Sequence, residues 1–105
     1  MYTEFNPKML QGYKILFELM EILGKKWIVP LLIFLLFYNE TTFTAIKKHL
    51  KVTSRALSKK LKLLEALGLV EKMGIENPRR VAYTLSEKGK EVSQMLLSFA
   101  TNFAK

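Results

Sequence analysis

Apolar residues recur at helical spacing over most of the chain, and this pattern divides it into a series of helices. Residues 9–23 carry an apolar stripe that is wider than packing against a single small core requires. Gly24 ends that stripe, and the strongly apolar run 27–38 (WIVPLLIFLLFY) follows, with Pro30 suited to the first turn of a helix. Spanning a membrane takes about 20 apolar residues. This shorter run, interrupted by proline, is therefore interpreted as a buried core helix.

The middle of the chain predicts a short helix and then a strongly amphipathic one. Residues 42–44 are expected to be briefly extended, with Thr44 capping a helix that ends near position 50. Thr53 and Ser54 are good N-cap residues for the next helix, whose apolar positions repeat at i, i+4 and i+7 until Gly68 stops it. The inward residues of that helix are Leu57, Leu61 and Leu64.

The last third of the chain predicts a hairpin and a final helix. Residues 69–73 and 80–85 have the composition of two strands, and a turn containing Pro78 separates them. Ser86 then caps a helix with an apolar seam that continues almost to the end of the chain. Gly89 is expected to weaken the start of this helix.

This order of elements is typical of a winged helix-turn-helix, a mainly α fold with a small β-hairpin. The length suits one domain, so we expect residues 1–105 to form a single winged helix-turn-helix domain. Its recognition helix is predicted over about 54–67 and its wing over about 73–81. The first helix (about 9–23) and the last (about 86–104) lie outside this motif.

The composition argues against an enzyme. The chain has no cysteine and no aspartate, and His49 is the one histidine, which excludes disulfides, Cys/His zinc sites and a Ser-His-Asp relay. A paired-glutamate hydrolase is the remaining enzymatic alternative, and against it Glu71 and Glu76 lie in a short polar stretch without a second acidic cluster. We expect no catalytic residue, metal or cofactor, and we expect His49 to face solvent or phosphate. The expected location is the cytoplasm.

The net charge of +8 is concentrated in one window of the sequence. Residues 47–62 (KKHLKVTSRALSKKLK) hold seven cations and no acid, and the rest of the chain has ten positive and nine negative residues. An ordinary solvated helix face is the alternative explanation. Like charges at this density cost stability unless a polyanion compensates them, which favours a nucleic-acid surface.

Helical spacing indicates which side chains would face DNA. Arg55, Ser58, Lys59 and Lys62 repeat on the side opposite the leucines. Arg55 is the best candidate to read a guanine, because its planar fork can bind O6 and N7 together. The predicted base contacts are Ser54, Arg55, Ser58 and Lys59. The predicted backbone contacts are Lys47, Lys48, Lys51, Thr53, Lys62, Arg79 and Arg80. For the two arginines, the alternative is that they belong to an ordinary solvent-exposed turn.

Three segments, LGKKWIVPLLIFLL, SRALSKKLKLLEALGLVEK and PRRVAYTLSEKGKEV, together resemble the HxlR-type family of winged-helix transcriptional regulators, relatives of the MarR group. The similarity covers roughly residues 14–100. It implies a small prokaryotic DNA-binding regulator that acts as a homodimer joined through its first and last helices. Apolar stripes wider than a single core can cover give an independent reason for pairing, although about half of these side chains are expected in the chain's own core. The predicted interface residues are Tyr13, Leu16, Phe17, Met20, Val92, Leu96, Phe99 and Phe103.

The chain departs from the family pattern in ways that bear on function. Several relatives sense oxidants through a cysteine before the first helix, and its absence here excludes thiol sensing. Arg79 stands where a second proline is common, which adds charge to the wing. A cavity between the dimer helices and the domain could hold a small aromatic effector.

The sequence thus predicts a homodimeric transcriptional regulator of duplex DNA, associated with the nucleoid. Two other functions are left open by the same residues. A sequence-tolerant architectural DNA-binding protein would use the cations for phosphate alone. A winged-helix protein-interaction module would bind DNA only weakly.

Overall fold

The core is built around one apolar helix, as the run at residues 27–38 predicts. A computed structural model describes residues 6–73 and 81–104. Helix α2 (Ile28–Tyr38) lies at the centre, and its residues Ile28, Leu31 and Leu32 are completely buried. A helix that is apolar on all sides is stable in water only when neighbours cover it. No helix in the described residues is long and apolar enough to cross a membrane.

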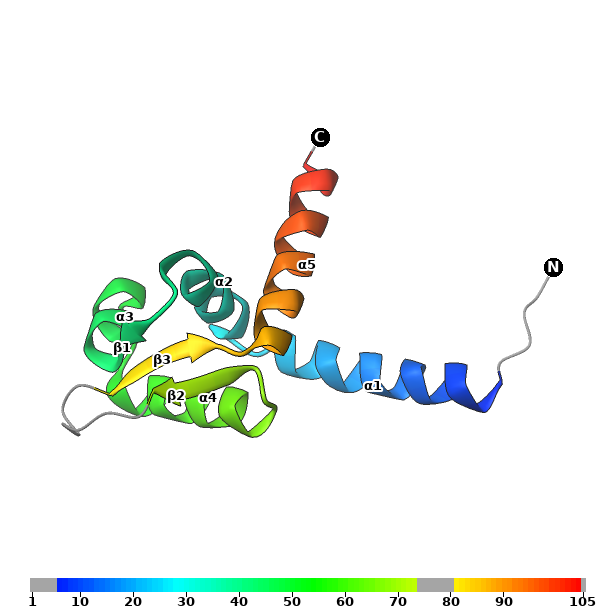
Figure 1. The fold of residues 1–105 in the computed structure, drawn as a ribbon, viewed down its shortest axis with the longest axis horizontal. Helices are drawn as coiled ribbons and strands as arrows, with labels where there is room; N and C mark the ends of the chain where they lie inside the picture. The colour runs from blue at the N-terminus through cyan, green and yellow to red at the C-terminus, as the bar shows by residue number, and fades with distance from the viewer. Residues whose placement is uncertain (1–5, 74–80, 105) are drawn as a thin grey trace.

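The described residues form four further helices and three short strands besides α2 (Figure 1). The helices are α1 (Pro7–Leu23), α3 (Phe43–Leu50), α4 (Ser54–Ala66) and α5 (Glu87–Phe103). The strands are β1 (Thr41–Thr42), β2 (Val70–Met73) and β3 (Ala82–Leu85). This arrangement confirms the mainly α, winged helix-turn-helix fold.

The sheet is larger than the expected hairpin. Strand β3 pairs with β2, and it also pairs antiparallel with β1 through Thr41 opposite Tyr83 and Thr42 opposite Ala82. The prediction that Thr44 caps the following helix is wrong, because the Thr42 hydroxyl oxygen accepts the backbone N–H of Ala45 at 3.2 Å. Thr42 is therefore both the last residue of β1 and the N-cap of α3, which begins at the next residue.

Leucines from α4 close the core beneath the sheet. Leu57, Leu61 and Leu64 are at most 2% exposed and pack with α2, as their spacing predicts. Gly68 follows the end of this helix with φ of +74°, a left-handed conformation that glycine adopts at least cost. The amphipathic pattern therefore predicted both the inward face of α4 and its end.

Two helices extend away from this core. Helix α1 and the C-terminal half of α5 project from the body in different directions (Figure 1). The radius of gyration is 16.0 Å, whereas a compact chain of this length has about 13 Å. Helix α1, which is described in full, has no buried side chain.

Candidate nucleic-acid interface

The basic window forms a helix-turn-helix, made of α3, a turn at residues 51–53 and α4. Lys51 ends α3 in the left-handed conformation, with φ of 56°, and its N–H donates to the Lys47 carbonyl at 2.9 Å. Thr53 then starts α4, its hydroxyl oxygen accepting the Ala56 N–H at 3.1 Å. With the leucines of α4 buried, the opposite face of this helix is directed outward.

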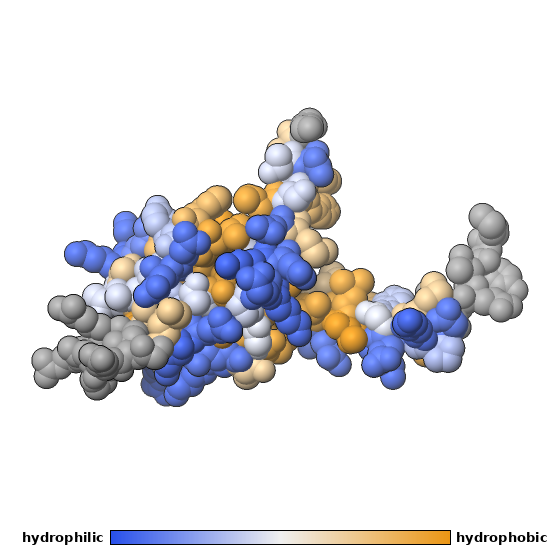
Figure 2. Space-filling view, in the orientation of Figure 1, coloured by the Kyte–Doolittle hydropathy of each residue, from blue (hydrophilic) through white to orange (hydrophobic). Residues whose placement is uncertain are grey.

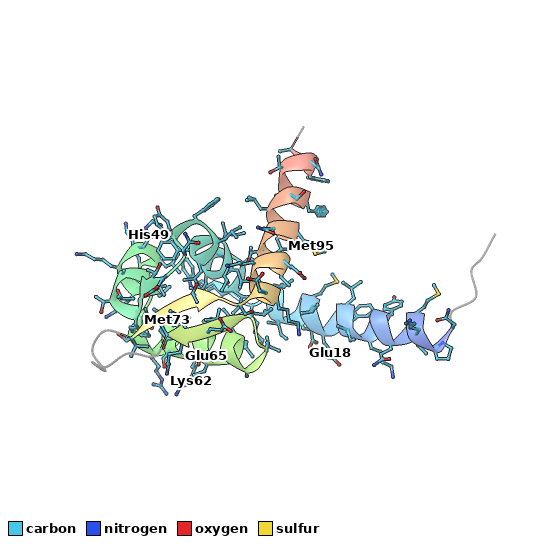
Figure 3. All side chains as sticks on the ribbon, in the orientation of Figure 1. Glu18, His49, Lys62, Glu65, Met73 and Met95 are labelled. Carbon is cyan, nitrogen blue, oxygen red and sulfur yellow. The ribbon has the colours of Figure 1, made fainter. Side chains whose placement is uncertain are left out.

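That outward face carries the predicted base-contacting residues. Ser54, Arg55 and Lys59 are exposed, and Ser58 is partly buried between them. Lys62 continues the same face and extends away from the body at its lower edge (Figure 3). The structure therefore brings these five residues onto one side of one helix, beginning at its N-terminus.

The lysines of α3 form the neighbouring part of the surface. Lys47 and Lys48 are exposed in its last turn, and with Lys51, Thr44 and Val52 they line an open hollow of about 480 Å³. Cations in the last turn of a helix are favoured by its dipole. Three ammonium groups around one open hollow form a surface suited to a phosphate backbone.

The seven cations of this window are not neutralised by the protein. None forms an ion pair with a carboxylate in the described residues, where the recorded pair joins Lys90 to Glu87 on α5. Hydrophilic side chains gather along the lower edge over α4, while apolar ones lie where α1, α2 and α5 meet (Figure 2). The cations of α3 and α4 are therefore available to an anionic partner.

Thr53 has a structural role besides its predicted contact with the DNA backbone. Replacing it by alanine removes the acceptor for the Ala56 N–H, and loss of such an N-cap costs about 1 kcal/mol. We expect Thr53→Ala to lower the free energy of unfolding by that amount in urea denaturation. Thr53→Ser keeps the hydroxyl and should unfold at nearly the same urea concentration as the wild type. An equal loss of unfolding free energy in both variants would contradict this capping role.

The structure describes the base of the wing, which is formed by strands β2 and β3. The Lys72 ammonium lies 5.9 Å from the centre of the Tyr83 ring on the paired strand. Burial raises the pKa of the Tyr83 hydroxyl, and the nearby Glu65 carboxylate adds to this shift, so the ring stays neutral. Arg79 and Arg80 lie outside the described residues.

His49 differs in part from its expected environment. It is exposed on α3, but its ring packs 4.4 Å from that of Phe34 and 5.6 Å from that of Tyr38, between centroids. Figure 3 places it on the upper edge, opposite Lys62. No periodicity predicted this contact, because it joins α2 to α3. His49 therefore packs on two aromatic rings rather than lying with the cations on the α4 face.

The predicted dimer residues fall into two groups. Tyr13, Leu16, Phe17 and Met20 are 45–58% exposed along α1, and Phe99 and Phe103 are 63% and 83% exposed on α5. Val92 and Leu96 are instead partly buried against the chain's own core. Met95 was not among the predicted residues, and it is 71% exposed in the angle between α5 and α1 (Figure 3). Its spacing of four from Phe99 was the available signal.

A basic recognition helix within a helix-turn-helix, followed by a small antiparallel sheet, defines the winged helix-turn-helix class of transcriptional regulators. The chain belongs to the HxlR-like helix-turn-helix family, whose model matches residues 22–104. It is 38% identical over 78 residues, 72% of this chain and 71% of the relative, to the uncharacterised HTH-type transcriptional regulator YvaP of Bacillus subtilis. These findings make it a transcriptional regulator of a DNA-binding family, not an enzyme.

Solved structures support the same assignment. A transcriptional regulator homologue from Pyrococcus horikoshii superposes with a TM-score of 0.71 and 29% identity, over 85% of this chain and 92% of the other. The reduced form of YodB, a transcriptional regulator from B. subtilis, superposes with a TM-score of 0.66 and 27% sequence identity, over 93% of this chain and 90% of the other. Both likenesses extend beyond the helix-turn-helix to most of the chain.

Proposed function

We propose that this protein is a homodimeric transcriptional regulator that places α4 of each protomer in the major groove of duplex DNA. The observation that carries the proposal is the unneutralised positive face of α3 and α4. The major groove admits one α-helix, and a two-fold dimer would place its two recognition helices about 34 Å apart, one turn of DNA. The 105 residues would act as one domain, associated with the nucleoid through its DNA.

The positions along α4 suggest separate roles in that complex. Ser54, Arg55, Ser58 and Lys59 lie in its first two turns, where a recognition helix meets base edges. The cations of α3 and its turn lie to one side, as phosphate contacts require, and Lys62 lies further along α4. We assign backbone contacts to Lys47, Lys48, Lys51, Thr53 and Lys62, and from the wing to Arg79 and Arg80.

The proposed dimer rests on the apolar surfaces of α1 and α5. Side chains of Met9, Tyr13, Leu16, Phe17 and Met20 line an open hollow of about 540 Å³ along α1. Monomeric proteins rarely expose contiguous apolar surface of this kind. A second copy would cover it, together with Phe99 and Phe103 of α5, and would explain why both helices extend from the core.

Selection of bound sites from random duplex DNA tests the proposal. A regulator of this design should enrich a two-fold related pair of short sequences, with centres one helical turn apart. Recovery of unrelated sequences with equal affinity would support an architectural DNA-binding protein instead. Failure to retain any duplex at low salt would support a protein-interaction module.

The phosphate contacts can be tested separately through their salt dependence. The logarithm of the association constant falls linearly with the logarithm of salt concentration, in proportion to the number of phosphates neutralised. We expect Lys47→Ala to weaken binding to all sequences alike and to reduce the slope by about 1. Lys14→Ala removes an exposed lysine from α1 and is the matched control; an unchanged slope for Lys47→Ala, or equal changes in both variants, would contradict the assignment.

Binding of a small aromatic effector stays a prediction, and the structure offers one candidate site for it. A hollow of about 190 Å³ lies between α1, α5 and residues 67–69, lined mainly by apolar side chains, with Glu18 and Lys88 among its lining residues. Benzoate is a suitable probe, because an aromatic carboxylate could contact both the apolar wall and the Lys88 ammonium. Methyl NMR shifts confined to Ile15, Leu19 and Val92 would support this place, and unchanged spectra would exclude it for this ligand class.

A further inference from the structure

The first turn of α5 is attached to the segment that directly follows the recognition helix. The Ser86 backbone N–H donates to the Leu69 carbonyl at 3.0 Å, and the Ser86 hydroxyl donates to the Gly68 carbonyl at 2.5 Å. The same hydroxyl oxygen accepts the Gly89 N–H at 3.0 Å and so caps α5. One serine therefore both starts α5 and joins it to the end of α4.

Gly89 makes this attachment tight. The expectation that it merely weakens the start of the helix is incomplete, because Gly89 is buried against Leu69. A Cβ atom at position 89 would lie 2.0 Å from the Leu69 carbonyl oxygen and 3.0 Å from its carbon. These are backbone atoms, which cannot rotate away as a side chain can. Any larger residue must therefore displace α5 from the 68–69 segment.

The 68–69 segment is in turn held by α4. The Gly68 N–H donates to the Glu65 carbonyl at 3.0 Å, and the Leu69 N–H donates to the Leu64 carbonyl at 2.9 Å. Backbone hydrogen bonds thus run from the last turn of α4, through residues 68 and 69, to the first residues of α5. Among these hydrogen bonds of the described residues, the Ser86 hydroxyl is the one side-chain group.

We infer that Gly68, Leu69, Ser86 and Gly89, here named the α4–α5 joint, are positioning residues that set the angle between the recognition helix and the dimer helix. The inference rests on the proposed function, in which α5 pairs with a second copy. In such a dimer the joint of each protomer fixes how far apart the two α4 helices lie. It therefore determines which spacing of half-sites the protein accepts.

The distance between the two recognition helices can be measured directly. Because the chain lacks cysteine, Lys62→Cys provides a unique attachment point for a nitroxide label on the exposed side of α4. Dipolar electron paramagnetic resonance on the DNA-free protein should give a single narrow distance between labels. Adding Gly89→Ala or Ser86→Ala to the labelled protein should replace the single narrow maximum of the distance distribution by a broad one. In unlabelled protein each change should reduce affinity for the selected paired site by roughly tenfold, without changing affinity for one half-site.

Two control variants separate positioning from general loss of stability. Thr42→Ala removes the N-cap of α3, where the Thr42 hydroxyl oxygen accepts the Ala45 N–H at 3.2 Å, and it should leave the distance distribution unchanged because α3 belongs neither to the joint nor to the proposed dimer helices. Ser86→Thr keeps the hydroxyl and should restore the narrow maximum. If circular dichroism shows that Gly89→Ala does not fold, Ser86→Ala decides the question.

The outcomes distinguish this inference from the proposed function. A labelled parent protein without dipolar coupling between protomers would overturn the dimer itself, and the inference with it. A coupled parent whose distance distribution is unchanged by Gly89→Ala and Ser86→Ala would overturn the joint alone. Equal broadening by Thr42→Ala would also overturn it, because loss of a helix cap away from the joint and the dimer helices would then suffice.

Discussion

Introducing a charge into the apolar face of α1 should separate the dimer into monomers. Leu16 is 54% exposed in the single chain, and a second copy of the protein is proposed to cover it. A carboxylate there would be buried without a partner in the dimer, at a cost that association cannot recover. We expect Leu16→Glu to sediment at the 12.2 kDa mass of one chain, whereas the wild type sediments at about twice that mass.

The same variant should lose most of its affinity for paired half-sites. Linking two DNA-binding modules raises affinity by about 10²–10⁴ over one module, so a monomer loses a factor of that order. Gln11→Glu adds the same charge on the other side of α1 and is the matched control, expected to dimerise normally. A wild-type monomer at micromolar concentration, or a dimeric Leu16→Glu protein, would contradict the proposed interface.

Removing the Arg55 side chain should weaken binding and also change its specificity. Arg55 is exposed in the first turn of α4, and a bidentate contact with guanine contributes about 1–3 kcal/mol of discrimination. We expect Arg55→Ala to lose that amount in binding free energy and to relax the preference at one base position. Titrations against the selected site and its single-base variants measure both effects.

Arg55→Lys is the informative comparison, because it keeps the charge and loses the planar fork. It should retain most of the affinity for random DNA but not the preference for guanine. If Arg55→Ala weakens all sequences equally, Arg55 contacts phosphate rather than a base, and another residue of α4 must read the sequence.

The helical part of the fold could be predicted because its information is local. The buried leucines of α4, its end at Gly68 and the buried run of α2 all follow from spacing, capping and hydropathy. The outward position of Arg55, Lys59 and Lys62 follows from the same periodicity, since a buried face fixes its opposite. The face proposed to bind DNA was therefore predictable residue by residue.

Contacts between distant segments could not be predicted in this way. The pairing of β1 with β3 joins Thr41 to Tyr83 and Thr42 to Ala82, which lie 42 and 40 positions apart, and a strand of two residues has no periodicity to detect. The need for glycine at position 89 also comes from a distant segment. The Leu69 carbonyl leaves no space for a side chain there, and it approaches Gly89 only after the chain folds. The rings packed on His49 are a third example, brought together by the crossing of α2 and α3.

The division of the apolar seam on α5 also depended on tertiary structure. Spacing placed Val92, Leu96, Phe99 and Phe103 on one continuous line, but the body of the protein covers only the first half of the helix. Val92 and Leu96 consequently pack in the core, and the two phenylalanines project beyond it. Where a helix leaves its own domain is decided by the length of its neighbours, which periodicity does not encode.

Competition between specific and random duplexes tests the central claim most directly. A duplex carrying the selected site and a random duplex of equal length would be titrated against the wild-type protein at the same physiological salt concentration, with binding followed by fluorescence anisotropy. A sequence-reading dimer should bind the selected duplex about a thousandfold or more tightly than the random one. Equal affinities for the two duplexes would contradict the account, because the positive face of α4 would then recognise the phosphate backbone alone.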